Sequence, residues 1–343
     1  MPEGHTVHRL ARTFANVFGG HTVHVTSPQG RFEQGAALLN GAQLVHAQAY
    51  GKHLFLGFTP TPNKTNVTHT DEPPPESLRW LRVHLGLYGS WTFAAHPNTP
   101  IAHAIGAPRR RIGEREHNLT PDQPEPHDTW TIPEPRGQVR VRIATAHAVA
   151  DLTGPTACEV LTYEQTRHHI NQLGPDPIRD DADPQRFLTA VNRSRSAIGG
   201  LLMNQKTIAG VGNIYRAEAL FRARLSPYTP GNTIPTHTLT ALWNDLVTLM
   251  RQGAHTGAIV TTHPADRNTT PPAPNNPRSR TRQNTDHTPD AIPTDQAFYV
   301  YQRHGQPCRR CGTPIALADM QARKLYWCPT CQSTSGEVLE HPA

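Results

Sequence analysis

The clearest helical pattern lies near the N-terminus. Over residues 7–18, apolar side chains recur three or four positions apart, with basic and polar side chains between them. This spacing puts the apolar side chains on one face of an α-helix, and that face is predicted to pack inward. The stretch MPEG, which precedes the helix, is therefore held at a fixed place in the fold.

A period of two replaces the helical period further along. Residues 21–58, 79–93 and 137–154 contain short runs in which apolar and polar side chains alternate, as in HTVHVTS and LRWLRVHLGLYGSWTF. Such alternation is typical of strands with one buried face. We expect an antiparallel β domain over 2–155 that begins with the helix and closes as a sandwich or barrel.

Two polar segments interrupt the strand pattern. Residues 59–77 and 96–137 lack periodicity and are rich in Pro, of which the whole chain contains 33 among 343 residues. Because Pro cannot donate to a strand ladder, we interpret both segments as long surface insertions.

The period becomes helical from about residue 156, beginning with CEVLTYEQTRHHINQLG, and stays so to 258. Residues 259–295 are of low complexity and too polar to bury a core, so they are predicted to be a linker. A short module over 296–335 follows. The expected fold class is therefore α+β with several domains.

Charge narrows the range of partners. The formal net charge of +6 suits a polyanion such as nucleic acid, although charge alone is weak support. The sequence has no run of about 18 apolar residues, and its start lacks the apolar block of a signal peptide. We expect a soluble cytoplasmic protein without a membrane partner.

Four cysteines near the C-terminus have metal-ligand spacing. The pairs CRRC and CPTC are typical of a four-cysteine zinc ribbon that holds one structural Zn²⁺. Two disulfides are the alternative, which an intracellular chain disfavours. The fifth cysteine, Cys158, is interpreted as a small buried hydrophobe. The four candidate ligands are Cys308, Cys311, Cys328 and Cys331.

Two further stretches could contact a phosphate backbone. In ARKLYWC, Arg323 and Lys324 precede two aromatic residues, and a hairpin there would present cations on one face. A helix is also predicted to end near Gln205, at the start of QKTIAGVGNIYRAE. A turn with Lys206 then leads into a second helix whose N-cap is predicted to be Asn213, and free N–H groups at a helix start can bind an anion. A solvated hairpin and an ordinary turn remain open alternatives.

Several short motifs follow one another along the chain. They are MPEG, GKHLFL, HLGLYG, LGPDP, QKTIAGVGNIYRAE, VYQRHGQPCRRCG and YWCPTCQ. Together they resemble the formamidopyrimidine-DNA glycosylase and endonuclease VIII family, most closely its actinobacterial endonuclease VIII branch. The resemblance implies an N-terminal β-sandwich, a helix-two-turns-helix domain and a C-terminal zinc ribbon.

The resemblance also implies a chemistry for the first residues. Met1 would be removed, and the secondary amine of Pro2 would attack C1′ of a damaged nucleotide to form a cationic iminium. Glu3 would act as general acid and base. Lys52, expected within a strand, would contact the phosphate beside the lesion and assist elimination. Without the other motifs, Pro2 could simply follow the initiator Met, Glu3 could complement a helix dipole, and Lys52 could be a surface lysine.

Other family positions imply DNA contacts. His84, Asn213 and Arg323 match residues that clamp phosphates, and Lys206 lies near them in the turn. Leu87 and Tyr88 match residues that fill the gap left by an everted base, with core strand residues as the alternative.

Thr6 stands where many relatives have Glu, and Gly86 stands where some endonuclease VIII proteins have a longer polar residue, which leaves the preferred lesion open. The implied function is a bifunctional DNA glycosylase and AP lyase of base-excision repair in a bacterium, associated with the nucleoid. It would excise oxidised bases, with pyrimidines favoured, and cleave by β,δ-elimination. The partner would be damaged duplex DNA bound by a monomer, with single-stranded or bubble DNA left open. A non-catalytic zinc-dependent DNA-binding protein and an RNA-binding module are the rivals.

Overall fold

The computed structural model describes residues 2–59, 75–96, 104–106, 130–267, 292 and 294–333. The chain divides into two compact units. The first comprises Met1–Pro2 and Thr6–Ile170, and the second comprises Glu3–His5 and Asn171–Ala343. Most of the two predicted insertions and of the predicted linker lies outside the described residues.

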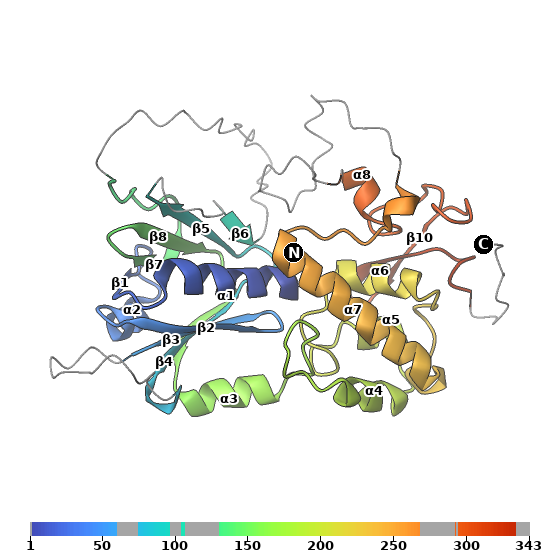
Figure 1. The fold of residues 1–343 in the computed structure, drawn as a ribbon, viewed down its shortest axis with the longest axis horizontal. Coiled ribbons are helices and arrows are strands. Elements are labelled where there is room, and N and C mark those ends of the chain that lie inside the picture. The colour runs from blue at the N-terminus through green and yellow to red at the C-terminus, as the bar shows by residue number, and fades with distance from the viewer. Residues whose placement is uncertain are drawn as a thin grey trace, which may run out of the picture. The chain divides into compact units, whose positions relative to one another are not determined.

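The first unit is a β-sandwich, as predicted (Figure 1). A four-stranded sheet has the order β2-β3-β4-β9, and a five-stranded sheet has the order β1-β7-β8-β5-β6, with all pairs antiparallel. The strands are β1 His24–Thr26, β2 Leu44–Tyr50, β3 His53–Phe58, β4 Arg79–His84, β5 Ser90–Ala95, β6 Ala104–Gly106, β7 Val139–Ala144, β8 Ala148–Thr153 and β9 Ala157–Leu161.

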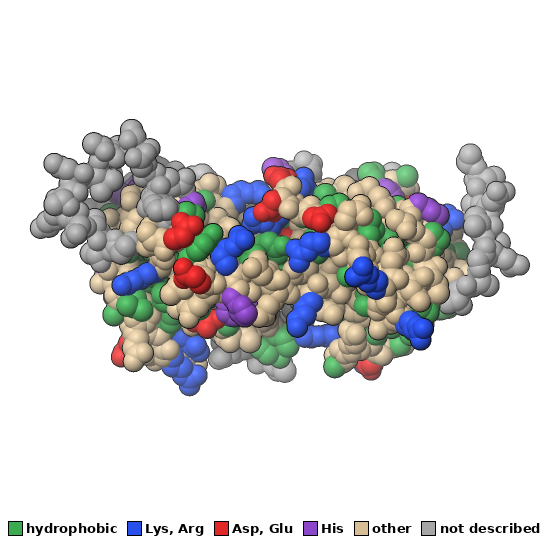
Figure 2. Space-filling model, turned by 90° about the horizontal axis from the view of Figure 1, so that it is seen from below, with side chains coloured by type: hydrophobic (Ala, Val, Ile, Leu, Met, Phe, Trp, Pro, Cys, Tyr) green, Lys and Arg blue, Asp and Glu red, His purple; other side chains and the backbone are tan. Residues whose placement is uncertain are grey.

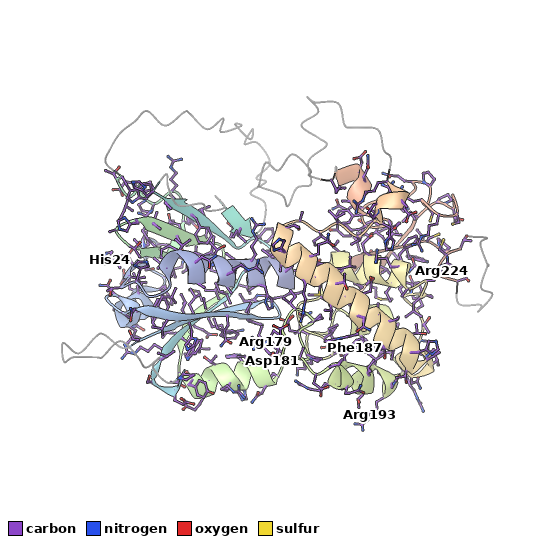
Figure 3. All side chains as sticks on the ribbon, in the orientation of Figure 1. His24, Arg179, Asp181, Phe187, Arg193 and Arg224 are labelled. Carbon is purple, nitrogen blue, oxygen red and sulfur yellow. The ribbon has the colours of Figure 1, made fainter. Side chains whose placement is uncertain are left out.

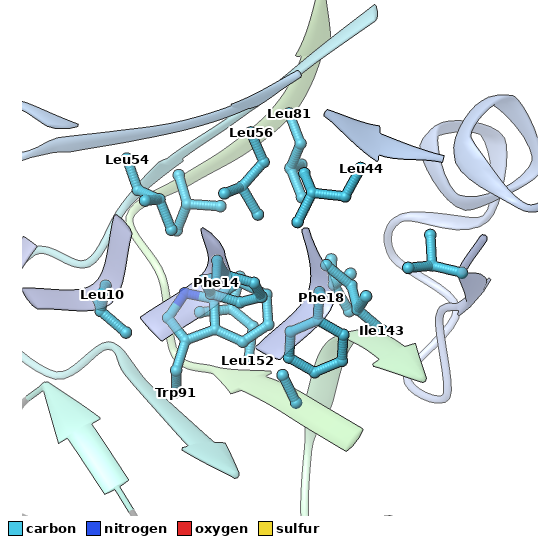
Figure 4. Packing of buried hydrophobic residues seen from close by; sticks show 14 of the residues in the cluster. Leu10, Phe14, Phe18, Leu44, Leu54, Leu56, Leu81, Trp91, Ile143 and Leu152 are labelled. Carbon is cyan, nitrogen blue, oxygen red and sulfur yellow. The ribbon is translucent and has the colours of Figure 1, made fainter. Parts of the chain in front are cut away.

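The leading helix, α1 (Gly4–Phe18), supplies the centre of the sandwich core. Leu10, Phe14 and Phe18 are fully buried. Figure 4 shows these side chains between leucines of the four-stranded sheet and Trp91, Ile143 and Leu152 of the five-stranded sheet. The predicted inward face of the helix is thus confirmed. The other helices of this unit are α2 Glu33–Leu39, the short 3₁₀ helix η1 Pro75–Ser77 and α3 Tyr163–Asn171.

The sequence pattern misplaced two details of the first unit. The stretch from 156, predicted to be helical, begins with strand β9, and α3 starts only at Tyr163. Cys158 and Val160 pack against the sandwich core on either side of Glu159, but Ala157 and Leu161 are apolar as well, so the strand period is hard to recognise beside the helix that follows. The predicted insertion 96–137 also contributes β6, which pairs with β5.

The second unit is helical, and its last two described strands form a hairpin. Its helices are α4 Pro184–Asn192, α5 Ile198–Leu201, α6 Asn213–Arg222, η2 Gly231–Thr233, α7 Thr236–Thr256, η3 Pro264–Asp266 and α8 Thr294–Ala297, followed by strands β10 Ala316–Met320 and β11 Arg323–Trp327. Phe187 of α4, labelled in Figure 3, packs on Trp243 of α7 with ring centroids 5.6 Å apart.

The helical core extends past the boundary that the composition suggested. Ile259, Thr261 and Thr262 are buried, although the linker was predicted to begin at 259. The backbone N–H of Thr261 donates to the carbonyl of Ala297 at 2.9 Å, so the two sides of the predicted linker meet. Among the described residues, no helix is long and apolar enough to cross a membrane.

Candidate functional site

Glu3 is a buried carboxylate fixed at the start of α6. The backbone N–H groups of Gly212 and Ile214 donate to its Oε2 and Oε1 at 2.9 and 2.8 Å, and that of Tyr215 donates to Oε2 at 3.4 Å. N–H groups in the first turn of a helix have no partner within the helix, and the positive end of the helix dipole favours an anion there. The start of α6 therefore stabilises Glu3 as an ionised carboxylate.

This contact requires a glycine at position 212. A Cβ atom on Gly212 would lie 2.4 Å from Cδ of Glu3, which is closer than real contacts allow. Gly212 is also the N-cap residue of α6, so the prediction that Asn213 is the N-cap is wrong. The reason is that a side chain 209 positions away in sequence supplies the capping acceptor. The same contact occupies N–H groups that we had expected to be open to a phosphate.

Pro2 directly precedes this fixed carboxylate. Glu3 to His5 belong to the second unit, and Pro2 belongs to the first, while Met1 lies outside the described residues. The backbone N–H of Gly4 donates to the carbonyl of Gly210 at 2.8 Å, which ties the chain down on the other side of Glu3. Glu3 and Gly4 of the MPEG stretch are therefore held in place by backbone and side-chain contacts to the turn before α6 and to the start of that helix.

That turn has its own internal support. The predicted preceding helix ends at Leu201 rather than near Gln205. The side chain of Gln205 accepts from the N–H of Gly210 and donates to the carbonyl of Val211, both at 3.0 Å. Because this side chain bonds to the backbone of the turn, the chain leaves the helix early. Lys206 is exposed next to it.

Asn213 and Arg216 bind the hairpin of β10 and β11 to α6. Nδ2 of Asn213 and Nη2 of Arg216 donate to the carbonyl of Lys324 at 2.8 and 3.0 Å, and Arg216 also donates to Oδ1 of Asn213. Arg216 is fully buried, and burial lowers its pKa to about 10. It is therefore still a cation at neutral pH. The predicted phosphate contact of Asn213 has to coexist with this bond to Lys324.

Arg323 lies at the tip of the same hairpin. Met320 and Arg323 are cross-strand partners, and the two residues between them, Gln321 and Ala322, have φ of 52° and 57°. Two left-handed residues form the tight turn that matches the twist of a hairpin. The hairpin thus presents Arg323 next to the anchored residue Lys324.

The four cysteines converge on one point. Their Sγ atoms all lie within 4.8 Å of one another. The separations of 3.9 Å for Cys308 and Cys331 and 3.4 Å for Cys311 and Cys328 exceed a disulfide bond of about 2.05 Å. Tetrahedral zinc with Zn–S bonds of about 2.3 Å places its sulfurs about 3.8 Å apart. The predicted site for one structural Zn²⁺ is confirmed, and the two-disulfide alternative is excluded.

Lys52 and His84 lie at the same end of the neighbouring strands β3 and β4 in the four-stranded sheet. Lys52 is in the turn between β2 and β3 rather than within a strand, because Tyr50 pairs with His53 across it. His53 in turn pairs with His84, and their ring centroids are 4.7 Å apart. Burial lowers the pKa of His84, and the positive charges of Lys52 and Arg82 lower it further.

Leu87 and Tyr88 lie in the loop that joins the two sheets of the sandwich. Their side chains are 40% and 82% exposed, whereas Leu85 before them is buried. The alternative that both are core strand residues is therefore wrong. Gly86 has φ of 66°, and a Cβ atom there would lie 1.8 Å from Oγ1 of Thr156. The departure at Gly86 thus matches the geometry of this loop.

Sequence reasoning missed one buried acid. Glu218 of α6 is fully buried and accepts from the N–H groups of Tyr299, Val300 and Tyr301 at 2.7 to 2.8 Å. Its signal was present, because Arg216 and Glu218 interrupt the otherwise apolar helix 214–221.

On the face shown in Figure 2, basic side chains lie among acidic ones, so charge alone marks no binding surface there.

Comparison with known proteins defines the class. The N-terminal domain of formamidopyrimidine-DNA glycosylase matches residues 1–131, its H2TH domain matches 173–264, and the zinc finger found in FPG and IleRS matches 305–334. The chain belongs to the formamidopyrimidine-DNA glycosylase and endonuclease VIII family, and it is a DNA glycosylase of base-excision repair.

Particular relatives sharpen this assignment. Endonuclease 8 1 of Mycobacterium tuberculosis (strain ATCC 25618 / H37Rv) is 40% identical over 97% of this chain and 100% of its own length. Probable endonuclease 8 2 of Streptomyces coelicolor is 25% identical over 97% of this chain and 94% of its own. The predicted endonuclease VIII resemblance is confirmed.

The fold matches solved structures as well. Wild-type Lactococcus lactis Fpg, crystallised with DNA containing N7-benzyl-Fapy-dG, superposes with a TM-score of 0.64 at 18% identity, covering 97% of this chain and 100% of that one. The same protein has been crystallised with DNA containing an abasic site, with a TM-score of 0.63. At this identity the likeness establishes the fold alone.

Proposed function

We propose that this glycosylase is bifunctional and uses Pro2 as its nucleophile. The observation that carries the proposal is that Glu3, the residue next to Pro2, has its carboxylate fixed by backbone N–H groups at the start of α6. A terminal amine titrates near 8, so part of it is unprotonated at neutral pH once Met1 is removed. A carboxylate beside it suits both proton transfer and the positive charge that the amine acquires.

The reaction follows from the residue type. The Pro2 nitrogen forms a bond to C1′ as the C1′–base bond breaks, and the base leaves with a proton. The C1′–O4′ bond then breaks and O4′ takes a proton, which leaves the opened sugar joined to Pro2 as an iminium cation and makes the C2′ proton acidic. Loss of that proton expels the 3′ phosphate, and a second elimination expels the 5′ phosphate. Glu3 relays protons in these steps, which is worth about 10²- to 10⁴-fold in rate.

Phosphate contacts would come from both units. Lys52 and His84 lie at one end of strands β3 and β4 in the first unit, and Arg323 lies at the hairpin tip of the second. We assign Lys52 a further part in sugar opening, and Asn213 and Lys206 supporting contacts. Because Leu87 and Tyr88 are exposed on a loop, they are suited to fill the gap left by an everted base.

The substrate proposed is damaged duplex DNA carrying an oxidised base, with pyrimidines favoured and cleavage by β,δ-elimination. Thr6 and Gly86 are the positions at which lesion preference would differ from relatives. We further propose a monomer that works in the bacterial cytoplasm at the nucleoid.

Borohydride trapping tests the nucleophile. Purified protein with a processed N-terminus should form a covalent adduct with a duplex that contains a preformed abasic site. A protein that retains any residue ahead of Pro2 should form none, because its amine has become an amide. Pro2→Gly should keep some trapping through its primary amine. No adduct from the processed protein would favour the non-catalytic DNA-binding alternative.

Glu3→Gln separates the two chemical steps. It should slow base excision far more than cleavage of a preformed abasic site, since the latter has no base to expel. A Gln amide would also point an N–H group at the backbone donors of α6, so thermal unfolding must be measured in parallel. Equal slowing of both steps would contradict the assigned role.

A salt series tests the phosphate contacts. Each neutralised phosphate contributes about −0.9 to the slope of log affinity against log salt. Arg323→Ala should make the slope shallower by about one and leave lesion preference unchanged, because phosphate contacts do not read bases. Leu87→Ala should leave the slope unchanged and slow excision from duplex more than from single strands. An unchanged slope for Arg323→Ala would contradict its assignment.

A further inference from the structure

A row of charged and imidazole side chains crosses the outer face of the four-stranded sheet. The cross-strand register places His53 opposite His84 and Arg82 opposite Glu159. Intervening residues such as Leu81 and Val83 point to the sandwich core. The row, which we term the polar row, runs from β3 and β4 through β9 to α3 and consists of His84, His53, Arg82, Glu159 and His169.

Arg82 stands at the centre of the polar row. Its Nε–H donates to Nδ1 of His53 at 3.2 Å, and its Nη1 forms an ion pair with Oε1 of Glu159. Nε2 of His169 lies 4.0 Å from the same Glu159 oxygen. The Arg82 side chain is only 13% exposed. One guanidinium therefore joins an imidazole to a carboxylate across three strands.

The bond from Arg82 fixes the state of His53. A guanidinium has only donors, so Nδ1 of His53 must accept, and the proton of the neutral ring resides on Nε2. Burial, with the charges of His84, Arg82, His169 and Lys52, lowers the pKa of His53 to about 3. His53 is thus a neutral ring of one tautomer, packed against His84.

We propose that Arg82 is a positioning residue for phosphate binding, which acts through His53 to hold the His84 imidazole beside Lys52. The inference rests on the proposed phosphate contacts of Lys52 and His84. The outer face of a sheet does not by itself need a nearly buried arginine that donates to a histidine. A ring that must meet a phosphate at a defined angle does require a fixed neighbour.

The arrangement also makes DNA affinity depend on the protonation of His84. The groups around His84 are Lys52 from the turn, His53 from β3, Arg82 from its own strand, Glu159 from β9 and His169 from α3. Lys52 and Arg82 disfavour a charged His84 in the free protein, whereas a phosphate beside Lys52 favours it. Binding therefore takes up a proton at His84, and affinity falls as the pH rises between the free and bound pKa values.

The test is Arg82→Gln, made in the wild-type chain and in a His84→Ala chain. Affinity is measured from pH 5.5 to 8.5 at fixed salt, with a duplex that contains a tetrahydrofuran abasic analogue. Alone, Arg82→Gln should weaken binding about fivefold. It should also move the fall in affinity to higher pH, since a cation near His84 is lost. In the His84→Ala chain it should have no further effect.

Arg142 provides a matched control. It pairs with Asp151 at 2.8 Å across β7 and β8, and the two side chains are 11% and 14% exposed. Arg142→Gln thus removes a comparably buried arginine from an ion pair in the other sheet of the same unit, and it should change neither affinity nor its pH dependence. Arg82→Lys keeps the charge but loses the fork, so it should weaken binding without moving the pH profile.

The outcomes separate the two proposals. If Arg82→Gln weakens binding equally with and without His84, then Arg82 does not act through His84 and the inference is overturned. If His84→Ala alone leaves affinity unchanged, the phosphate contact under the proposed function fails, and the inference falls with it. If Arg82→Gln does not fold, the comparison of Arg82→Lys in the two chains decides in the same way.

Discussion

The β-sandwich and the hairpin segment 294–333 both bury short strands, but they do so by different means. In the sandwich, α1 inserts Phe14 and Phe18 between two sheets, and the ring of Phe14 meets that of Trp91 edge-on at 4.8 Å. In the hairpin segment, the buried set includes Cys308 and Cys328 themselves.

Polar contacts then attach the hairpin segment to α6. Glu218 accepts from three consecutive backbone N–H groups, and Arg216 and Asn213 donate to the carbonyl of Lys324. Hydrophobic burial is tolerant of small shifts because it has no direction, whereas each of these bonds fixes a position. The position of Arg323 at the hairpin tip therefore depends on the cysteine site and on these polar partners.

Loss of zinc should have the largest effect, because it should unfold the hairpin segment and leave the sandwich folded. Cys328→Ser removes a ligand from a site whose apparent binding free energy is roughly 10 to 16 kcal/mol, so the hairpin segment should unfold and zinc should be lost. DNA affinity should fall at least tenfold, while the sandwich should keep its own unfolding transition. Metal analysis, calorimetry and a binding assay check these outcomes.

Cys158→Ser is the control for that experiment. Burial raises the pKa of the Cys158 thiol to about 12, and the residue packs against the sandwich core. It should leave zinc content and DNA affinity unchanged. A zinc-free protein that binds DNA normally would show that the hairpin does not depend on its metal.

Truncation of the sandwich core should come next in size. Phe14→Ala should cost about 3 to 5 kcal/mol of unfolding free energy, because Phe14 is fully buried between two sheets. Zinc should remain bound, since none of its ligands belongs to that core. Denaturant unfolding with metal analysis checks both points. The partly buried Val17, changed to Ala, serves as the milder control, and equal costs for the two would contradict the packing described.

Acid should weaken the sandwich through His53. Its pKa is about 3 in the folded protein against 6.5 as the ordinary value, so the unfolded chain binds the proton more strongly. The stability that His53 contributes is complete above pH 6.5 and is lost as the pH falls toward 3. At pH 5 the loss is about 2 kcal/mol. His53→Gln should reduce the difference in unfolding free energy between pH 7.5 and pH 5 by that amount.

Shortening the predicted linker should have the smallest effect. The two flanks are already joined, because Thr262 Oγ1 donates to the carbonyl of Gln296 at 2.7 Å and Thr261 N–H donates to that of Ala297. On the prediction from sequence that residues 268–291 are a linker, replacing them by about eight Gly and Ser residues should alter only loop-closure entropy, which changes by about 0.6 kcal/mol for each doubling of length. Zinc content, melting temperature and DNA affinity should stay close to wild type. A tenfold loss of affinity would assign the segment a role of its own.

The sequence predicted most of the architecture because its signals are local. Helical spacing over 7–18, alternation in the strands and the two CxxC pairs each depend on near neighbours. Where two periods overlap, as at β9 and α3, the same reasoning failed. It also failed at α5, which ends at Leu201, because the side-chain bonds of Gln205 to Gly210 and Val211 are invisible to periodicity.

By itself, the sequence determined the three kinds of structure, the zinc ligands and the candidates Pro2, Glu3 and Lys52. Only the tertiary structure decided that Glu3 caps α6, that Lys52 occupies a turn beside His84, and that Leu87 and Tyr88 are exposed. The physical reason is the separation in sequence between the residues that make contact. Periodicity and ligand spacing reflect contacts within a few residues, whereas a cap supplied from 209 positions away, or a histidine across a strand pair, exists only once the chain has folded.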